Sequence, residues 1–509
     1  MHLDARGDGE MADDHDAPPL SRDVLVRLHG ALLPATVPLL AHADVAATYL
    51  VSNRDQTVGG DWFDACVTVD GRLALAVGDV VGTGIQSSVT MSDLRSVLGS
   101  HLQDGTSVAE SLAVLDRIAL RAPHAFASSV CVAVLDPRTG ELEYATRGHP
   151  PPLVVTATGA TTLPATAGGT LGGSDPGTTA HAVLPLGAAL VLCTDGLVDH
   201  PGASIDASWQ ALSRAAAAAL GDDGDRHESA AVRLCRRVPA ELGADGFDDD
   251  VTLLVAHRRP APAPLDVRTT AQAASLGPLR GAIGRWGASV GLTPRDAALL
   301  ELAVSETAAN SVEHAYRGVA PGPVSVHAEL DDTATVTVTV TDAGTWQEPS
   351  SMPSDRGRGL AMARMGGVDV QVDTGASGTC VTLRLPARRR VPLDVGPARA
   401  STRSDVSIDT AQVGVVRVGG VVDRPEAASR VSSEVNRQSR GGLLPVTVEL
   451  GDLTFLGSIG VRALQTLTDA GAPGGAPVTL VAAAGSRAAG TLRLAGLPFE
   501  TTLLAAPAE

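Results

Sequence analysis

Short apolar segments that end or begin at acidic residues recur through the first half of the chain. Residues 73–77 are uninterruptedly apolar and run into Gly78 and Asp79, which is typical of a buried strand followed by a tight turn. A second such segment, 190–193, leads through Thr194 to Asp195. The pattern predicts buried strands whose ends carry carboxylates.

Helical periodicity appears at other places along the chain. Leucine and valine spacing predicts a short amphipathic helix over 20–33, which ends before Pro34. A longer helix begins after Thr293, a suitable N-cap with Pro294 and Asp296 behind it, and extends to His314. Beyond residue 407, strand-like and helical segments alternate, which predicts a small parallel or mixed sheet. These segments are 413–418, 426–438, 446–450, 453–464 and 478–481.

Composition narrows the class of protein. The 509 residues suggest about three domains, and the formal net charge of −18 argues against nucleic acid or an anionic membrane as the main partner. No apolar run approaches twenty residues and no signal peptide is recognisable, so we expect a cytoplasmic protein. The cysteines lack pair or metal spacing and are expected to be reduced, mostly core thiols. They are Cys66, Cys131, Cys193, Cys235 and Cys380.

Lysine is absent, and every basic side chain apart from histidine is an arginine. A phosphate-binding loop of the Walker type, the strand lysine of protein kinases and Schiff-base chemistry all require lysine. Any nucleotide chemistry must therefore proceed without it.

Acidic residues flank four predicted strands of the first half. Asp61 follows Gly59 and Gly60, Asp79 and Asp195 close their strands, and Asp249 precedes the apolar segment 251–255. If these strands are neighbours, their carboxylates converge and repel one another unless a cation joins them. Mg²⁺ and Mn²⁺ prefer such oxygen ligands, and two ions together can hydrolyse phosphate esters.

The motifs around these residues resemble those of the metal-dependent protein serine/threonine phosphatases, in the bacterial branch typified by the sporulation stage II E phosphatase. They are Val-Gly-Gly-Asp-Trp-Phe-Asp at 58–64, Gly-Asp-Val-Val-Gly-Thr-Gly at 78–84, Arg-Gly-His-Pro-Pro-Pro-Leu at 147–153, Thr-Asp-Gly-Leu-Val at 194–198 and Asp-Asp-Val-Thr-Leu-Leu at 249–254. The resemblance implies that Asp61 and Asp79 bridge two metal ions and act in catalysis. It further implies that the carbonyl of Val80, with Asp195 and Asp249, completes the set of metal ligands.

One position departs from that family pattern. Thr83 stands where the family often has histidine or asparagine. If that residue helps to protonate the leaving group, a threonine cannot do so near neutral pH, and slower turnover is expected.

A second set of motifs lies between 265 and 386. Glu306 and Asn310 are four residues apart on one face of the predicted helix, and a strand-like segment, 336–340, runs into Asp342 and Gly344. Taken singly, these residues fit an ordinary solvated helix and a turn. Further along the chain come Gly357, Gly359, Gly378 and Thr379.

Taken together, this set resembles the GHKL ATPases, and within them the small serine kinases that act as anti-sigma factors. The resemblance implies that Asn310 binds Mg²⁺, that Glu306 is the base toward the acceptor hydroxyl, and that Asp342 binds the adenine amino group. It also implies that Gly357 and Gly359 belong to a lid over the ATP phosphates, with Gly344, Gly378 and Thr379 in the same nucleotide site. The GHKL fold binds ATP without a phosphate-loop lysine, in keeping with the composition.

Residues 455–461, Phe-Leu-Gly-Ser-Ile-Gly-Val, resemble the STAS domains of anti-sigma-factor antagonists, in which a serine at a helix N-terminus accepts phosphate. Ser458 is therefore a candidate phospho-acceptor. Gly457 and Ile459 depart from the family pattern, which has aspartate before the serine and a small polar residue after it. The alternative is that Ser458 is only the N-cap of its helix.

The expected fold class is multidomain α+β: a phosphatase α-β-β-α sandwich, a GHKL-type α/β sandwich and a small STAS α/β domain. The expected organisation is a disordered 1–19, a phosphatase over 20–258, a linker at 259–264, the ATPase/kinase over 265–386, a linker at 387–406 and the STAS domain over 407–509. The arginine run 388–390 within the second linker is expected to be solvated.

Together these resemblances predict a protein that regulates a sigma factor by partner switching. A Mn²⁺- or Mg²⁺-dependent phosphoserine/phosphothreonine phosphatase would be joined to an ATP–Mg²⁺-dependent serine kinase and a substrate-like STAS domain. The expected partner is a phosphorylated STAS-type antagonist, in cis or in trans. One alternative is a non-catalytic scaffold whose kinase or phosphatase has decayed; another, a two-metal nuclease, is disfavoured by the acidic surface.

Overall fold

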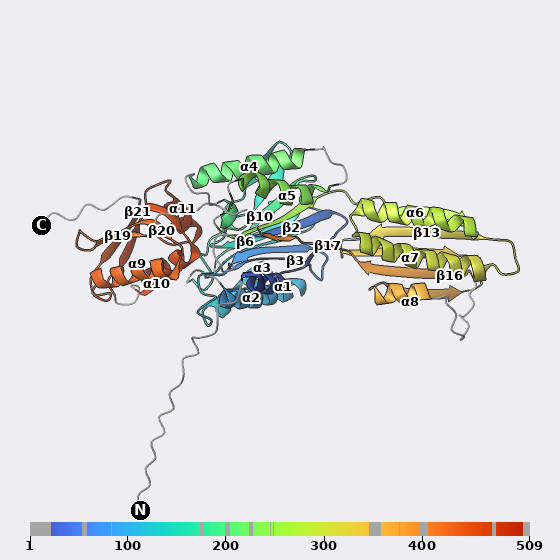
Figure 1. The fold of residues 1–509 in the computed structure, drawn as a ribbon, viewed down its shortest axis with the longest axis horizontal. Helices are drawn as coiled ribbons and strands as arrows, with labels where there is room; N and C mark the ends of the chain where they lie inside the picture. The colour runs from blue at the N-terminus through green and yellow to red at the C-terminus, as the bar shows by residue number, and fades with distance from the viewer. Residues whose placement is uncertain are drawn as a thin grey trace, which may run out of the picture.

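The computed structural model describes residues 22–501 apart from 53–58, 83, 174, 176, 199–203, 223–227, 245, 248, 346–357, 376, 396–405 and 471–474. Three modules follow one another in the sequence, and the first lies between the other two in space (Figure 1). We call them the first module (22–258), the second module (265–386) and the C-terminal module (406–501). The predicted disorder of 1–19 concerns residues outside the described part.

Two stacked β-sheets with helices on both outer faces form the first module (Figure 1), so the predicted α-β-β-α sandwich is confirmed. One sheet has the order β18-β2-β11-β10-β7-β8, in which β18 is the strand Leu393–Val395, and the other has the order β3-β4-β5-β6-β9. Leucine, valine and alanine side chains of both sheets fill the space between them. The predicted helix at 20–33 is observed as α1 (Arg22–Leu32).

The strands of the two sheets alternate along the chain with helices that cover them. The strands are β1 (Thr36–Pro38), β2 (Ala43–Val51), β3 (Asp61–Val67), β4 (Leu73–Asp79), β5 (Ser129–Leu135), β6 (Glu141–Arg147), β7 (Leu153–Thr156), β8 (Gly159–Thr162), β9 (Ala180–Val183), β10 (Ala189–Cys193) and β11 (Val251–Arg258). Helices α2 (Ile85–Gln103) and α3 (Val108–Ala119) cover the sheet of β3, whereas α4 (Ile205–Gly221) and α5 (Ala230–Leu242) cover the sheet of β2. A short 3-10 helix, η1 (Asp195–Leu197), follows β10.

An antiparallel sheet of order β12-β13-β14-β16-β15 carries the second module, with α6 and α7 packed on one face. Its elements are β12 (Leu265–Thr270), α6 (Ala273–Val290), α7 (Pro294–Asn310), η2 (Ser311–Ala315), β13 (Pro323–Leu330), β14 (Thr335–Asp342), α8 (Arg358–Met365), β15 (Asp369–Gly375) and β16 (Gly378–Pro386). The predicted N-cap is present, because Oγ1 of Thr293 accepts the N–H of Asp296 at 3.1 Å. The α-helix ends earlier than expected, at Asn310, and continues to Ala315 as one π-helical turn.

The C-terminal module has a four-stranded mixed sheet, β19-β20-β21-β22, as the alternation of strands and helices predicts. Its elements are β19 (Ser407–Asp409), β20 (Val415–Val422), α9 (Pro425–Gln438), β21 (Val446–Leu456), α10 (Ser458–Ala470), β22 (Val478–Val481) and α11 (Arg487–Leu494). Only β19 runs antiparallel to its neighbour.

The chain that leaves the second module turns back onto the first module. β17 (Arg388–Arg390) pairs antiparallel with β1, and β18 (Leu393–Val395) lies parallel beside β2. Arg389 forms an ion pair with Asp44 at 2.7 Å and donates to the carbonyl of Val45 at 2.6 Å. The expectation of a solvated arginine run holds for the exposed Arg388 and Arg390 but is wrong for Arg389, because the run forms a strand on the first module and Arg389 pairs with the buried Asp44.

No helix in the described part of the chain is both long enough and apolar enough to span a membrane. The five cysteines are all free thiols, and Cys131, Cys193 and Cys235 are buried, as the absence of pair spacing predicts.

Candidate functional site

The centre of the first module's site is a pair of carboxylates on adjacent strands. Asp61 opens β3, Asp79 closes β4, and the two residues face each other in the antiparallel register. The N–H of Val80 donates to the carbonyl of Gly60 at 3.1 Å, and a Cβ on Gly60 would lie only 1.9 Å from the oxygen of Val80. Glycine at position 60 therefore lets the two backbones approach closely enough to bring the acids together.

The opposite sheet supplies a third carboxylate, that of Asp195, and holds the side chain of Asp61 in place. Asp195 begins η1 directly after β10 and Thr194. Oγ1 of Thr194 donates to Oδ2 of Asp61 at 2.6 Å, and Oγ1 of Thr252 donates to the same oxygen at 3.3 Å. These hydrogen bonds orient the buried Asp61 side chain from β10 and β11, across the space between the two sheets.

Burial and mutual repulsion disfavour the charged forms of these acids. Burial, followed by the charges of Asp79, Asp249 and Asp250, raises the pKa of Asp61 well above its ordinary value. The pKa of Asp79 is raised in the same way, by burial and then by Asp195, Asp249 and Asp250. Burial also raises the pKa of Asp195. Clustered buried carboxylates of this kind fit hard divalent cations, which relieve the repulsion.

Asp249 is more exposed than the other three predicted metal-binding carboxylates. It is exposed at the rim, and its Oδ1 accepts the N–H of Asp250 at 2.8 Å. In the described residues, no three His, Cys, Asp or Glu side chains form a ready-made metal-binding group. The structure thus brings Asp61, Asp79 and Asp195 to one place, with Asp249 beside them. Thr83 lies outside the described residues.

Asp250 is a functional residue that sequence reasoning missed. Its buried carboxylate accepts three hydrogen bonds, from Oη of Tyr49 (2.8 Å) and from the N–H groups of Ser52 (2.7 Å) and Gly59 (2.9 Å). Asp250 thereby anchors the segment that leads into Gly60 and Asp61, so it acts as a positioning residue. The run of three aspartates at 248–250 was the available signal, but it does not tell which of them faces inward.

The motif at 147–153 supports the wall of the site. Nη2 of Arg147 lies 3.2 Å from Oδ2 of Asp116, and Nδ1 of His149 is hydrogen-bonded to Oγ of Ser129 at 2.8 Å. Burial lowers the pKa of His149 to about 3, so its imidazole is neutral near pH 7. Ser129 is also the strand partner of Asp79, so the motif adjoins the carboxylates.

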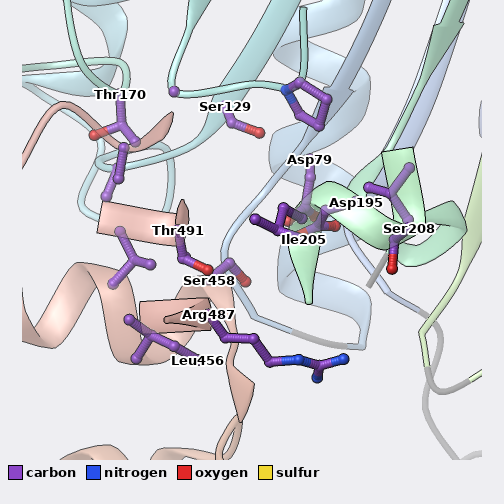
Figure 2. A pocket seen from close by; sticks show the side chains of 16 residues that line it. Asp79, Ser129, Thr170, Asp195, Ile205, Ser208, Leu456, Ser458, Arg487 and Thr491 are labelled. Carbon is purple, nitrogen blue, oxygen red and sulfur yellow. The ribbon is translucent and has the colours of Figure 1, made fainter. Parts of the chain in front are cut away.

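A cavity of about 70 Å³ opens beside the carboxylates, and two modules line it (Figure 2). The first module contributes residues that include Asp79, Asp195, Ser129 and Ile205. The C-terminal module contributes Leu456, Ser458, Val461, Arg487, Thr491 and Ala495. The candidate phospho-acceptor Ser458 therefore lies at the same cavity as two of the predicted metal ligands, which the sequence did not indicate.

Ser458 does not occupy the N-cap position of its helix. It is the first residue of α10, and the N–H of Val461 donates to the carbonyl of Gly457 at 3.0 Å. The N-cap is the residue whose carbonyl accepts the first hydrogen bond of the helix, and here that residue is Gly457. The interpretation of Ser458 as only the N-cap is therefore wrong.

The predicted nucleotide residues of the second module gather where α7 and two strands end. Oδ2 of Asp342 accepts from Oγ of Ser311 at 2.6 Å, and its Oδ1 accepts the N–H of Gly344 at 3.0 Å. Thr379 is the strand partner of Asp342, and its buried Oγ1 lacks a hydrogen-bond partner among the described residues. An unpaired buried hydroxyl beside a carboxylate is a fitting site for a polar ligand.

The remaining predicted residues surround this point. Asn310 is the last residue of α7, and Glu306 lies one turn earlier; both are half-buried. The π-helical turn that follows Asn310 is a feature often found at functional sites. A Cβ on Gly378 would lie 1.8 Å from the carbonyl oxygen of Asp342, so glycine is required there. Gly359 belongs to α8, and Gly357 lies outside the described residues.

Comparison with known families supports the assignment of the first module as a phosphatase domain and of the second module as an ATPase domain. The family model "Stage II sporulation protein E (SpoIIE)" matches residues 69–259, and the model "Histidine kinase-like ATPase domain" matches residues 269–385. The STAS assignment of the C-terminal module stays a prediction.

Among solved structures, one is similar over most of this chain and supports the same two assignments. The RsbU and RsbW domains of Rv1364c from Mycobacterium tuberculosis are 35% identical, with a TM-score of 0.63; the match covers 72% of this chain and 99% of that chain. The SiaA-PP2C domain of Pseudomonas aeruginosa is 18% identical (TM-score 0.37; 47% and 95% of the two chains). The PP2C phosphatase domain and regulatory fragment of SpoIIE from Bacillus subtilis is 15% identical (TM-score 0.36; 44% and 66%).

Proposed function

Because the chain belongs to the family in which a SpoIIE-type phosphatase domain is joined to a histidine kinase-like ATPase domain, as in the RsbU and RsbW domains, we propose that it is a partner-switching enzyme. Its first module is a phosphoserine/phosphothreonine protein phosphatase. The observation that carries the proposal is the pair of Asp61 and Asp79, held in register and joined by Asp195 from the opposite sheet.

The donor set of this site suits two Mn²⁺ or Mg²⁺ ions. Asp61 and Asp79 would bridge them, and Asp195, Asp249 and the carbonyl of Val80 would complete their protein ligands. When bound, such ions supply a nucleophilic water near neutral pH and neutralise charge on the phosphoryl oxygens. The protein's own part is to hold Asp61 through Thr194 and Thr252, and to exclude bulk water with the buried walls of both sheets.

The second module is proposed to be an ATP–Mg²⁺-dependent serine kinase that acts as an anti-sigma factor. Asp342 would bind the adenine amino group, Asn310 the Mg²⁺ ion, and Glu306 would take the proton of the acceptor hydroxyl. The unpaired hydroxyl of Thr379, next to Asp342, supports a polar ligand at this place. Gly344, Gly357, Gly359 and Gly378 would shape the nucleotide site and its lid.

The C-terminal module is proposed to be a STAS domain with Ser458 as the phospho-acceptor. A phosphoserine adds roughly −2 charge, and the kinase and phosphatase would write and erase it. Tethering all three modules in one chain keeps each at a local concentration near millimolar for the others. The sigma factor and any separate antagonist protein are then partners, and direct contact with nucleic acid or membrane is not part of this proposal.

Replacement of one bridging carboxylate tests the phosphatase directly. With p-nitrophenyl phosphate and Mn²⁺, we expect Asp79→Asn to lose about 100-fold or more in kcat/KM, because one charge between the two cations is removed. Asp104→Asn, at the exposed C-cap of α2, is the matched control and should behave as the parent. Hydrolysis that is equally fast in EDTA would overturn the metal assignment, and a folded parent without metal-dependent hydrolysis would favour the scaffold alternative.

A further inference from the structure

The C-terminal module is seated on the first module through contacts that extend beyond the carboxylates, although Thr170 and Ile205 of this contact also line the carboxylate cavity. Oγ1 of Thr170 donates to Oε1 of Gln465 at 2.8 Å, and both side chains are about 95% buried, with 4% and 5% exposed. A buried hydrogen bond between polar side chains costs free energy when one partner is missing. The pair therefore favours this particular seating over a loose hydrophobic contact.

Two glycines allow the backbones of the modules to meet. A Cβ on Gly169 would lie 2.8 Å from the carbonyl oxygen of Ala495, in the turn that follows α11. On the other side of the contact, a Cβ on Gly490 would lie 3.2 Å from Cγ2 of Ile205 at the start of α4. Larger side chains at either position would separate the modules, so the contact is specific in shape.

The position of Gln465 on α10 determines where Ser458 lies. Residues 458, 461 and 465 are spaced i, i+3 and i+7, so they share one face of the helix. Seven residues of α-helix span about 10 Å, which separates the anchored Gln465 from Ser458. Val461 and Ser458 both line the cavity that contains Asp79 and Asp195 (Figure 2). Anchoring Gln465 at Thr170 thus presents Ser458 to the carboxylates.

We propose that Gly169, Thr170 and Ile205 form a docking surface that selects this chain's own C-terminal module as the substrate of the phosphatase. The proposal rests on the phosphatase function proposed above and adds the surface by which the substrate is recognised. The cavity of about 70 Å³ exceeds the roughly 10–15 Å³ that one water molecule needs, but it suits a small group and not an extended peptide. Recognition must therefore come from the folded surface around the serine.

Docking in cis is compatible with the length of the connection. The last segment that pairs with the first module before the C-terminal module is β18, which ends at Val395, and the C-terminal module begins at residue 406. The ten intervening residues can span at most about 35 Å when fully extended. The module can leave the surface, but it stays within reach of it.

The reaction at this site is the hydrolysis of a phosphate monoester. A water oxygen forms the new bond to phosphorus while the bond from phosphorus to Oγ of Ser458 breaks, and the electron pair leaves with Oγ. A proton from the water ends on Oγ, so the products are serine and inorganic phosphate. Arg487, which lines the cavity and donates to the carbonyl of Thr454 at 2.9 Å, places a positive charge beside the phosphorylated serine.

The test uses the full chain with phosphoserine incorporated at position 458 during translation, so that kinase activity is not required. After Mn²⁺ is added, the loss of phosphate is followed by intact mass, and p-nitrophenyl phosphate hydrolysis is measured in parallel. We expect Gly169→Val to slow the loss of phosphate from Ser458 at least tenfold, without reducing p-nitrophenyl phosphate hydrolysis. Gly159→Val, where a Cβ meets nothing within 4 Å, is the matched control and should equal the parent in both assays.

A second variant approaches the contact from the other module. Gly490→Leu should also slow phosphate loss from Ser458 without reducing p-nitrophenyl phosphate hydrolysis, because its new side chain meets Ile205. The substitution should not unfold α11, because leucine has a better helix propensity than glycine. Phosphate loss at the parent's rate in both variants would overturn the docking surface. A parent that hydrolyses p-nitrophenyl phosphate but keeps the phosphate on Ser458 would overturn the inference alone, and a parent inactive on both would overturn the proposed phosphatase as well.

Discussion

The first module touches its two neighbours in different ways. Its junction with the second module has a shared core, because Leu39 and Ala41 lie among the buried residues of the second module, and the segment that leaves the second module pairs with β1 through β17. A buried carboxylate reinforces it: Asp332 accepts from the N–H of His42 at 2.9 Å and lies 2.8 Å from Nε of Arg138. Among the described residues, its contact with the C-terminal module shows no strand pairing and no shared core, and it includes a buried hydrogen bond and close approaches at glycine.

The junction with the second module is therefore permanent, whereas the contact with the C-terminal module can open. Strand pairing and a common core cannot be broken without unfolding part of both modules. A contact formed by surface hydrogen bonds, each of which contributes about 0.5–1.5 kcal/mol, and by shape can be released by a single charge or a bulky side chain. Such a contact suits a substrate that must bind and leave, whereas the phosphatase and the ATPase behave as one unit.

Loss of the buried charge pair at the joint should have the largest effect on stability. Asp44 is 1% exposed and Arg389 15%, and Asp44 also accepts the N–H of Ala231 at 3.1 Å. Asp44→Ala leaves Arg389 buried without its carboxylate, so we expect a loss of about 3–5 kcal/mol in the free energy of unfolding. Denaturant unfolding measures it.

The exposed pair of Asp70 and Arg72 provides the control. Asp70→Ala should cost no more than about 1 kcal/mol, because both side chains are solvated. Equal losses in the two variants would contradict the view that the return of the chain through β17 holds the joint together.

A smaller effect is expected at the far end of β14, in the proposed nucleotide site. Asp342→Asn should weaken ATP binding by about 1.5–3 kcal/mol, because a charged acceptor is removed from the proposed adenine contact. Isothermal titration calorimetry measures the affinity, and Asp369→Asn, at the exposed edge strand β15, should bind ATP as the parent does. Unchanged affinity in both Asp342→Asn and Asn310→Ala would leave the kinase assignment without support.

The smallest effect is expected at Asp332, and it should depend on pH. Burial alone would raise the pKa of this carboxyl, but hydrogen bonds from Arg138 and from the N–H and ring of His42 outweigh burial and lower the pKa. A lowered pKa means that the contribution is present above the unfolded value of 3.8 and is lost as the pH falls through the folded value.

We therefore expect Asp332→Asn to lower the free energy of unfolding by about 1 kcal/mol at pH 7, since the partner Arg138 is largely exposed. The difference from the parent should shrink as the pH falls below about 4. If the difference in the free energy of unfolding between Asp332→Asn and the parent grew as the pH fell, the lowered pKa of Asp332 would be contradicted.

The sequence was sufficient for the elements whose signals are local. The apolar run at 73–77 and the acids at its end predicted β4 and Asp79, and Thr293 with Asp296 predicted the start of α7. The pairing of Asp61 with Asp79 followed from the motif resemblance. In these cases a residue's neighbours in the chain determine its conformation.

The contacts that join distant segments could not be predicted in this way. Arg388–Arg390 reads as a solvated charge run, and only Asp44 and β1, more than 340 residues earlier, make it a strand. Likewise Thr170 and Gln465 are 295 positions apart, and neither belongs to a recognisable motif. Their meeting depends on how whole modules pack, which is why the place of Ser458 at the carboxylate cavity emerged only from the structure.

Small-angle X-ray scattering of the full chain tests the central claim most directly, namely that the C-terminal module docks releasably while the second module does not. The parent should scatter as a row of three modules with the C-terminal module seated on the first, as in Figure 1. Gly169→Val should increase the radius of gyration and the maximum dimension, because the module moves out to the length of its ten-residue connection, whereas Gly159→Val should not. Superimposable profiles for Gly169→Val and the parent, or a parent profile that already requires a detached C-terminal module, would contradict the account.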